Sequence, residues 1–457
     1  MLAILLALSV AQQAPAAPVD VLIKNGTVVT VDGEMRVLEG ASLAIRGEKI
    51  DAIIPAGQTL PPARETIDAS GHLVMPGLVN THGHVPMVLL RGLADDRKLM
   101  DWLYSFIFPA EGRTVNSGFS YWGALLGCIE MARSGTTTFT DMYYYEEDVA
   151  RAVDKAGLRA VLGQTIIGFP APDHKTTDGA LAATEALIQR YKAHPRIVPS
   201  VAPHALYSTP LEVIRRARDL SVKYGVPFQI HAAESPEEDA DVMKKYGKTT
   251  VSVLDEAGVL GRGVILHHAI TLTDADIALI ARRGVGTSHN PQSNMKGGAG
   301  LARVPELLKA GVAVGLGTDG AASNNNLDMF EEMDTAAKVH KLMRSDPTVM
   351  PARDVLQMAT IGGARALGLG DRVGSLEVGK LADVVLVDLR IPELTPLYDV
   401  YSHQVYAIKG GQVRTVLVGG RVIVRDRVMT TIDATEVMTM ARQNQQRIRG
   451  AVDASAR

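Results

Sequence analysis

The sequence has little cysteine, few aromatic residues and no excess of charge of one sign. Its single cysteine, Cys128, excludes a disulfide within the chain and a thiolate metal cluster. A metal site would therefore need His, Asp and Glu ligands. Only seven Phe and two Trp argue against an aromatic platform for single-stranded nucleic acid. With 47 basic and 50 acidic residues the net charge is −3, so no general surface for a polyanion, including nucleic acid, is expected.

Long apolar runs are also missing, and no stretch reaches the roughly 20 residues of a membrane helix. Residues 1–18 are apolar and then rich in Ala and Pro, and the small-x-small pattern at residues 9–11 resembles a cleavage site. No Lys or Arg precedes Lys24, so the usual basic start of a signal peptide is absent. We expect residues 1–18 to be a signal peptide that exports the protein to the periplasm or beyond; the alternative is a leader on a cytoplasmic protein.

Two β-rich segments flank the long middle of the chain. Residues 19–75 and 370–430 alternate apolar and polar positions between turn dipeptides such as Asn-Gly and Gly-Gly, a pattern typical of short antiparallel strands. Neither segment has enough strands for its own core. We therefore expect one composite β-sandwich domain rather than two separate modules, followed by a helical tail at 431–457.

Between these segments, residues 76–369 contain eight β-like runs that alternate with helical stretches. This alternation predicts an α/β fold, a (β/α)8 TIM barrel; a doubly wound sheet is the alternative, but no Gly-x-Gly-x-x-Gly follows the first run. Barrel enzymes place their chemistry where strands end. Seven of the twelve histidines lie at such ends: His82, His84, His204, His231, His267, His268 and His289.

Some of these residues have the character of metal ligands. His82 and His84 are two positions apart, so on a strand both imidazoles point to one side. His231 ends the fifth run and Asp319 ends the eighth. The ordinary alternatives are solvated or core histidines and a helix-capping Asp319. Three imidazoles and one carboxylate suit one divalent ion, with zinc expected first and iron or manganese as alternatives.

Five segments carry a resemblance to a known family: PGLVNTHGH, HAAE, LHHA, SHNPQSN and LGTDGAASNN. They resemble the motifs of the amidohydrolase superfamily, and in particular its branch of methylthioadenosine/S-adenosylhomocysteine deaminases, to which the triazine hydrolases are related. HVPMVLLRGLADDRKLMDWL strengthens the narrower match. The resemblance extends from Val19 to about Met429. It implies a hydrolase of carbon–nitrogen bonds other than peptide bonds, with His82, His84, His231 and Asp319 as metal ligands.

The resemblance also implies roles for residues around the metal. Asp319 would take the proton of the attacking water and pass it to the leaving ammonia. Glu234 would protonate the ring nitrogen beside the attacked carbon, and His268 would orient the water. Glu111 and His204 would contact the substrate. His267 and His289 are expected to be structural.

One position departs from the family pattern. Gln164 stands where these deaminases carry an arginine after the third strand, and we expect it to face the substrate in that arginine's place. Because arginine binds both oxygens of a carboxylate, its loss predicts little preference for S-adenosylhomocysteine over simpler adenosines. The alternative is that another cation, such as Lys175 or Arg113, reaches the carboxylate.

The sequence thus predicts a metal-dependent hydrolytic deaminase of an aminated heterocycle, above all an adenosine-like nucleoside. The alternatives are a triazine hydrolase, a deaminase of guanine, pterin or cytosine type, a cyclic-amide hydrolase and a non-catalytic binding barrel. Cyclic-amide hydrolases of the superfamily often use two metals bridged by a carboxylated lysine, but the fourth strand ends in His204, which favours one metal. Whether the chain forms a homo-oligomer is left open.

Overall fold

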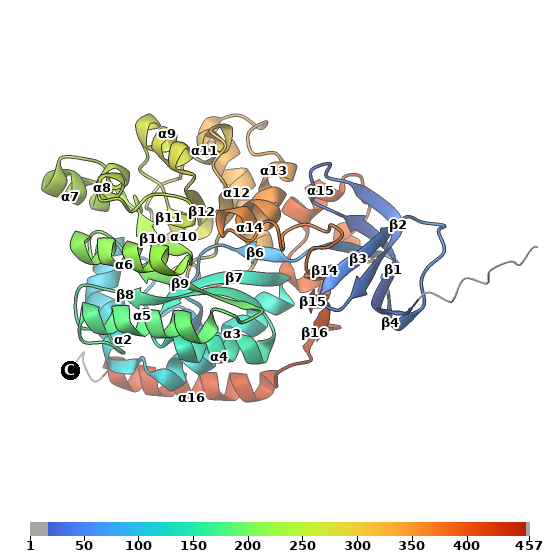
Figure 1. The fold of residues 1–457 in the computed structure, drawn as a ribbon, viewed down its shortest axis with the longest axis horizontal. Helices are drawn as coiled ribbons and strands as arrows, with labels where there is room; N and C mark the ends of the chain where they lie inside the picture. The colour runs from blue at the N-terminus through green and yellow to red at the C-terminus, as the bar shows by residue number, and fades with distance from the viewer. Residues whose placement is uncertain (1–16, 454–457) are drawn as a thin grey trace, which may run out of the picture.

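The structure, a computed structural model, describes residues 17–453 and contains a closed barrel beside a separate sheet (Figure 1). Neighbouring barrel strands are parallel, and the last pairs with the first. This arrangement confirms the predicted (β/α)8 barrel. Its strands are β6 (Leu78–Asn80), β7 (Thr136–Tyr143), β8 (Arg159–Ile166), β9 (Ile197–Pro203), β10 (Phe228–Ala232), β11 (Val264–His268), β12 (Gly286–His289) and β13 (Val314–Leu316).

The helices around the barrel begin and end at the signals that the sequence provides. Helix α9 starts at a capping box formed by Thr273 and Asp276, and it ends at Gly284, whose φ of 67° suits glycine. Gly225 ends α6 in the same way. The longer helices are α3 (Ser117–Arg133), α4 (Glu146–Ala156), α5 (Thr177–Tyr191), α6 (Leu211–Tyr224), α7 (Pro236–Tyr246), α9 (Asp274–Arg283) and α12 (Met329–Arg344).

Both chain ends contribute to one nine-stranded sheet. Strand β14 pairs antiparallel with β5 and so joins the two segments, which confirms the composite domain and rules out two separate modules. Its own core contains Ile23, Leu43, Val384, Leu386 and Leu417. The strands are β1 (Val19–Val29), β2 (Val37–Arg46), β3 (Lys49–Ile54), β4 (Ala63–Asp68), β5 (His72–Pro76), β14 (Val384–Asp388), β15 (Val413–Val418), β16 (Arg421–Arg425) and β17 (Val428–Met429).

The chain passes from the sheet into the barrel at Gly77, which divides the first predicted run into β5 and β6. A Cβ atom at this position would lie 1.9 Å from Thr137 Oγ1, so glycine is required for the close approach. A buried ion pair between Arg159 Nε and Asp383 Oδ2, 3.1 Å apart, also joins the barrel to the sheet. The loop after β6, which carries the predicted metal ligands His82 and His84, therefore starts from a fixed point.

Helix α16 (Ala434–Asp453) runs along the barrel beside α3 and α2 (Phe108–Thr114) (Figure 1). The predicted leader, residues 1–18, lies outside the described residues apart from its last two positions, and it stays a prediction. Among residues 17–453, none of the helices combines the length and apolarity that crossing a membrane requires.

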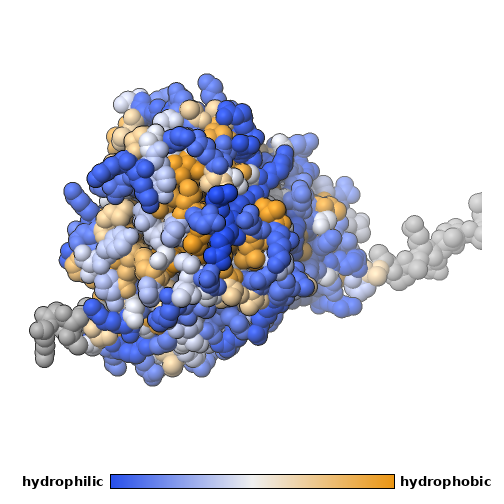
Figure 2. Space-filling view, turned by 60° about the vertical axis from the view of Figure 1, so that its left-hand side comes forward, coloured by the Kyte–Doolittle hydropathy of each residue, from blue (hydrophilic) through white to orange (hydrophobic). Residues whose placement is uncertain are grey.

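The face of the molecule shown in Figure 2 is mostly hydrophilic, but apolar residues gather near its centre. This is the side that lies at the left of Figure 1. Apolar surface gathered in one place on a protein is often functional.

Candidate metal-centred active site

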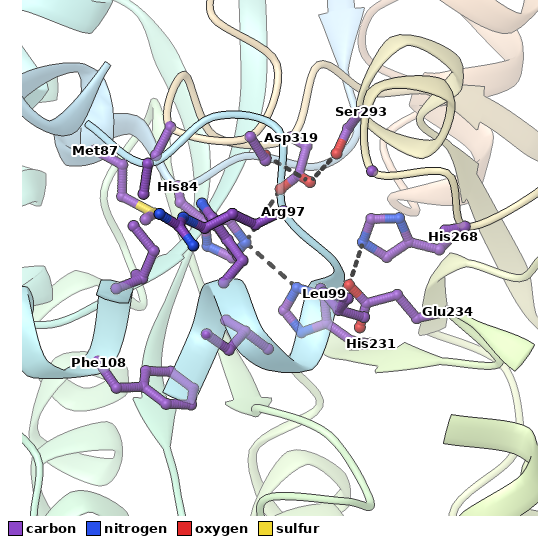
Figure 3. A pocket seen from close by; sticks show the side chains of 18 of the residues that line it. His84, Met87, Arg97, Leu99, Phe108, His231, Glu234, His268, Ser293 and Asp319 are labelled. Atoms are coloured by element: carbon purple, nitrogen blue, oxygen red, sulfur yellow. Dashed lines mark hydrogen bonds and ion pairs between the residues drawn. The ribbon is translucent and has the colours of Figure 1, made fainter. Parts of the chain in front are cut away.

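A cavity that is open to solvent contains most of the predicted site residues (Figure 3). Its apolar wall comes largely from the segment after β6, which holds η1 (Val85–Leu90), α1 (Leu99–Asp101), η2 (Trp102–Ile107) and α2. The apolar lining residues include Met87, Leu99, Trp102, Leu103, Ile107 and Phe108, and the polar ones include His84, Glu111, His204, His231, Glu234, His268 and Asp319.

The four predicted metal ligands lie close together, and three of them, His84, His231 and Asp319, line the cavity. His82 Nε2 and His84 Nε2 each lie 3.3 Å from Asp319 Oδ1. His231 Nε2 lies 3.3 Å from His84 Nε2. The potential ligand atoms of His82, His84 and Asp319 are all within 4.8 Å of one another, as are those of His82, His231 and His268. The strand ends thus bring together a donor set that could hold a divalent ion.

Hydrogen bonds to backbone carbonyls fix the tautomers of two of these rings. His84 Nδ1 is 2.8 Å from the carbonyl oxygen of Met142, and His231 Nδ1 is 2.8 Å from that of His204. Because a carbonyl only accepts, each Nδ1 must carry the proton, and each Nε2 presents a lone pair to the cluster.

His82 provides the test of whether this set fits a metal. It is fully buried, and neither ring nitrogen has a hydrogen-bond partner among the described residues. Burial lowers the pKa of His82 to about 3, so the ring is neutral. The His82 ring stacks on the ring of His267, with 3.9 Å between ring centroids. A buried lone pair without a partner is costly, and a metal ion would satisfy it, so the residues fit a divalent cation.

Asp319 is held by its neighbours in a strained backbone conformation. Its φ of 60° lies in the left-handed region, which is costly outside glycine and is typical of functional sites. Oδ2 accepts hydrogen bonds from Ser293 Oγ (2.6 Å) and Ser323 Oγ (2.9 Å). Burial favours a higher pKa, but the neighbouring imidazoles of His82, His268 and His84 outweigh it and hold the pKa of Asp319 well below its usual value. The group is therefore a carboxylate.

Glu234 faces the metal ligands from the wall of the cavity. Only 8% of the residue is exposed, and burial raises the pKa of its carboxyl group. Oε1 lies 3.6 Å from His268 Nε2, and Oε2 accepts a hydrogen bond of 3.1 Å from the Tyr207 hydroxyl. His268 Nδ1 is 2.9 Å from Asn294 Oδ1, so its Nε2 is left to face the cavity. A carboxyl group with a raised pKa is suited to proton transfer near neutral pH.

Two predicted substrate contacts also line the cavity. Glu111 on α2 is buried, and its Oε1 accepts a hydrogen bond of 2.6 Å from the Tyr143 hydroxyl. Burial raises the pKa of Glu111 to about 8. His204 Nδ1 pairs with Ser208 Oγ at 2.7 Å, and burial lowers the pKa of His204 to about 3. Both side chains can exchange hydrogen bonds with a bound ligand.

The structure contradicts the expected substrate contact of Gln164. Its side chain does not line the cavity but donates to Asp173 Oδ2 at 2.7 Å, while Thr165, the next residue on β8, does line it. Alternate residues on a strand point to opposite sides, and a motif match gives the position of a residue but not the direction of its side chain. Lys175 and Arg113, the alternative cations, do not line the cavity either.

Three further residues that line the cavity, Arg97, Lys296 and Tyr207, were not predicted from the sequence. Among residues 17–453, the Lys and Arg side chains that line it are Arg97 and Lys296. Lys296 is paired with Asp95 at 2.6 Å. Arg97 is in the segment quoted for the family resemblance, and Tyr207 follows His204 by three positions, but neither has a motif signal of its own.

Comparisons with known proteins place the chain in a family. Residues 73–423 match the Amidohydrolase family. The chain belongs to the amidohydrolase family. It is 46% identical over 425 residues to a 5-methylthioadenosine/S-adenosylhomocysteine deaminase from Syntrophobacter fumaroxidans, covering 93% of this chain and 97% of the relative. The amidohydrolase superfamily is metal-dependent, and this chain is a hydrolase of carbon–nitrogen bonds, as the resemblance implied.

Two solved structures have the same architecture as this chain. An adenosine deaminase from Xanthomonas campestris, with bound zinc, superposes with a TM-score of 0.93 at 38% identity, over 96% of this chain and 100% of that one. A triazine hydrolase from Arthrobacter aurescens has a TM-score of 0.86 at 24% identity, over 93% and 99% of the two chains, and shows the shared fold. The deaminase relative and the adenosine deaminase structure confirm the predicted relation to deaminases, and the triazine hydrolase has the same fold.

The donor set leads to a prediction of metal stoichiometry. We expect one equivalent of divalent metal per chain, because the ligand atoms of His82, His84 and Asp319 lie within 4.8 Å of one another, and Lys296, the lysine that lines the cavity in the described part of the chain, is paired with Asp95. Elemental analysis of the purified, metal-reconstituted protein measures this ratio. Two equivalents, or none, would contradict the single-ion site.

Proposed function

We propose that this chain is a hydrolytic deaminase of adenosine-like nucleosides that uses one divalent ion, with zinc as the expected metal. The observation that carries the proposal is the placement of Glu234, a buried carboxyl group with a raised pKa, in the same cavity as the ligand cluster of His82, His84, His231 and Asp319. The relatives named as deaminases, one of them solved with zinc, support the same reaction.

The residues of the cavity can perform the proton transfers of a deamination. When bound, the metal would lower the pKa of a water molecule towards about 7. Asp319, an ionised carboxylate anchored by two serine hydroxyls, accepts a proton from the attacking water and later delivers it to the departing ammonia. Glu234 protonates the ring nitrogen next to the attacked carbon. A carbon–oxygen bond to the water oxygen forms, the carbon–nitrogen bond to the amino group breaks, and ammonia leaves. The second proton of the water returns to Glu234, which restores the acid and leaves the ring product in its oxo form.

The rest of the cavity suits a nucleoside. Leu103, Ile107 and Phe108 provide apolar surface for a flat heterocycle. Glu111 is a buried acid with a single hydroxyl partner, and so it can accept hydrogen bonds from sugar hydroxyls. His204 has two roles. Its ring lines the cavity, and its carbonyl oxygen accepts the hydrogen bond from His231.

The position of Arg97 indicates which kind of group the substrate carries at its sugar 5′ position. Its side chain reaches over the cavity (Figure 3) and stacks on the Phe106 ring, with Cζ 3.6 Å from the ring centroid. It has one ion pair in the described residues, to Asp101 at 3.4 Å. A guanidinium group has five N–H donors, so donors remain for an anionic substrate group.

Replacing Arg97 by Met is therefore expected to reduce the ratio of kcat/KM for S-adenosylhomocysteine to that for 5′-methylthioadenosine. The first substrate carries a carboxylate, and a hydrogen bond to a charged group contributes about 1.5–3 kcal/mol, which predicts a fall of about tenfold or more. Lys175→Met is the matched control, because Lys175 does not line the cavity. An unchanged ratio in Arg97→Met would remove Arg97 from substrate recognition.

A screen for ammonia release tests the proposed function. The metal-loaded protein is incubated with adenosine, 5′-modified adenosines, guanine, pterins, cytosine and aminotriazines. We expect ammonia from the adenosine group and a corresponding 6-oxo product. Release from an aminated free base or a triazine alone would assign the site to that substrate class instead.

A further inference from the structure

We propose that Tyr207 is a positioning residue for catalysis, whose hydroxyl group fixes the orientation of the Glu234 carboxyl group in the cavity. The inference rests on the proposed function, because it concerns the group that is assigned to proton transfer. It is carried by the hydrogen bond of 3.1 Å from the Tyr207 hydroxyl to Glu234 Oε2 and by the position of both side chains on the cavity wall.

Glu234 needs such a partner because its carboxyl group is free to turn. The terminal torsion of a glutamate side chain has broad, roughly two-fold preferences, so staggering alone does not select one orientation. The backbone N–H of Glu234 donates to Glu238 Oε2 at 2.7 Å, which holds the main chain but not the carboxyl group. With Oε2 bound to Tyr207, Oε1 is left pointing towards His268 Nε2, 3.6 Å away (Figure 3).

The Tyr207 hydroxyl group is suited to donate permanently. Burial raises the pKa of Tyr207 well above its usual value, and the Glu234 charge acts in the same direction. The proton therefore stays on the phenol throughout the working pH range. A fixed donor on one carboxyl oxygen allows the other oxygen to gain and lose a proton without the group rotating.

Tyr207 belongs to a short turn that serves the metal ligands as well. This turn, residues 204–208, follows β9, and its first carbonyl oxygen accepts from His231 Nδ1. The ring of Tyr207 makes an edge contact with the ring of His204, with 5.7 Å between centroids. The turn thus places a metal ligand, a substrate-facing imidazole and the acid Glu234 relative to one another.

Tyr207→Phe tests the proposal, since it removes the hydroxyl group and keeps the packing of the ring. A hydrogen bond to a charged group is worth about 1.5–3 kcal/mol, so kcat for 5′-methylthioadenosine is expected to fall about tenfold or more. KM is expected to stay within about threefold, because binding does not depend on the orientation of the acid. Metal content and melting temperature are measured alongside and should match the wild type.

The matched control is Tyr224→Phe, which removes a tyrosine–glutamate hydrogen bond to Glu185 between α6 and α5, away from the cavity. Its kcat should equal that of the wild type. The double variant Tyr207→Phe/Glu234→Gln separates positioning from a structural role. If Tyr207 acts through Glu234, the double variant should be no slower than Glu234→Gln alone, because residues that act as a unit are not additive.

Three results would overturn the assignment of Tyr207. The first is a kcat in Tyr207→Phe within about twofold of the wild type, and the second is a double variant in which the two losses multiply. A Tyr207→Phe variant with lowered melting temperature and lowered metal content would likewise assign the residue to structure. If the wild type releases no ammonia from any nucleoside, the proposed function itself fails, and the Tyr207 proposal fails with it.

Discussion

Glu234→Gln is expected to retain its metal and to lose turnover by about 10²–10⁴-fold, the usual cost of removing a general acid or base. The amide is nearly the same size as the carboxyl group, and it can still accept from Tyr207, so the cavity keeps its shape. It cannot give a proton to the ring nitrogen. Steady-state kinetics with an adenosine-type substrate, together with elemental analysis, measure the two effects separately.

The control for this variant is Glu237→Gln, which changes an exposed acid on the adjoining helix α7. It should behave as the wild type in both measurements. Near-normal turnover in Glu234→Gln would reassign the proton-transfer role to another group, and loss of the metal would instead make Glu234 a ligand or its support.

His231→Ala, unlike Glu234→Gln, is expected to lose both metal and activity. Its Nε2 is one of the clustered lone pairs, 3.3 Å from His84 Nε2, and alanine leaves the remaining ligands with an incomplete shell. The metal retained after dialysis against a chelator should drop to a small fraction of the wild-type value, and kcat should drop with it. The readout is metal content, so it does not depend on knowing the substrate.

His403→Ala is the matched control, because His403 lies outside the cavity and bonds to the Asp399 carbonyl oxygen. It should bind metal and turn over substrate normally. Full metal occupancy in His231→Ala would show that residues other than His231 hold the ion.

The sequence allowed the barrel and its metal site to be predicted together. Strand runs alternating with helices indicated the architecture, and ligands at the ends of β6, β10 and β13 could meet only in a closed barrel. What the sequence did not show was the break at Gly77. The run there is apolar on both sides, and only the approach of Thr137 reveals why the chain turns from sheet to barrel.

The substrate side of the site was harder to predict for a physical reason. A motif alignment gives a position on a strand, but at a strand end the direction of the side chain decides whether it meets the cavity. Gln164 turns to Asp173, whereas its neighbour Thr165 lines the cavity. Arg97 and Tyr207 come from loops and turns, where no periodic pattern indicates which side chains face inward.

The most direct test of the central claim, hydrolytic deamination at this metal site, is a reaction of the metal-loaded protein with adenosine or 5′-methylthioadenosine in water enriched in oxygen-18. Mass spectrometry of the product and an ammonia assay are run on the same sample, with His231→Ala in parallel. The account predicts one ammonia per product, one heavy oxygen in the ring product, and neither in His231→Ala. Unchanged nucleoside without ammonia, or equal turnover by His231→Ala, would contradict it.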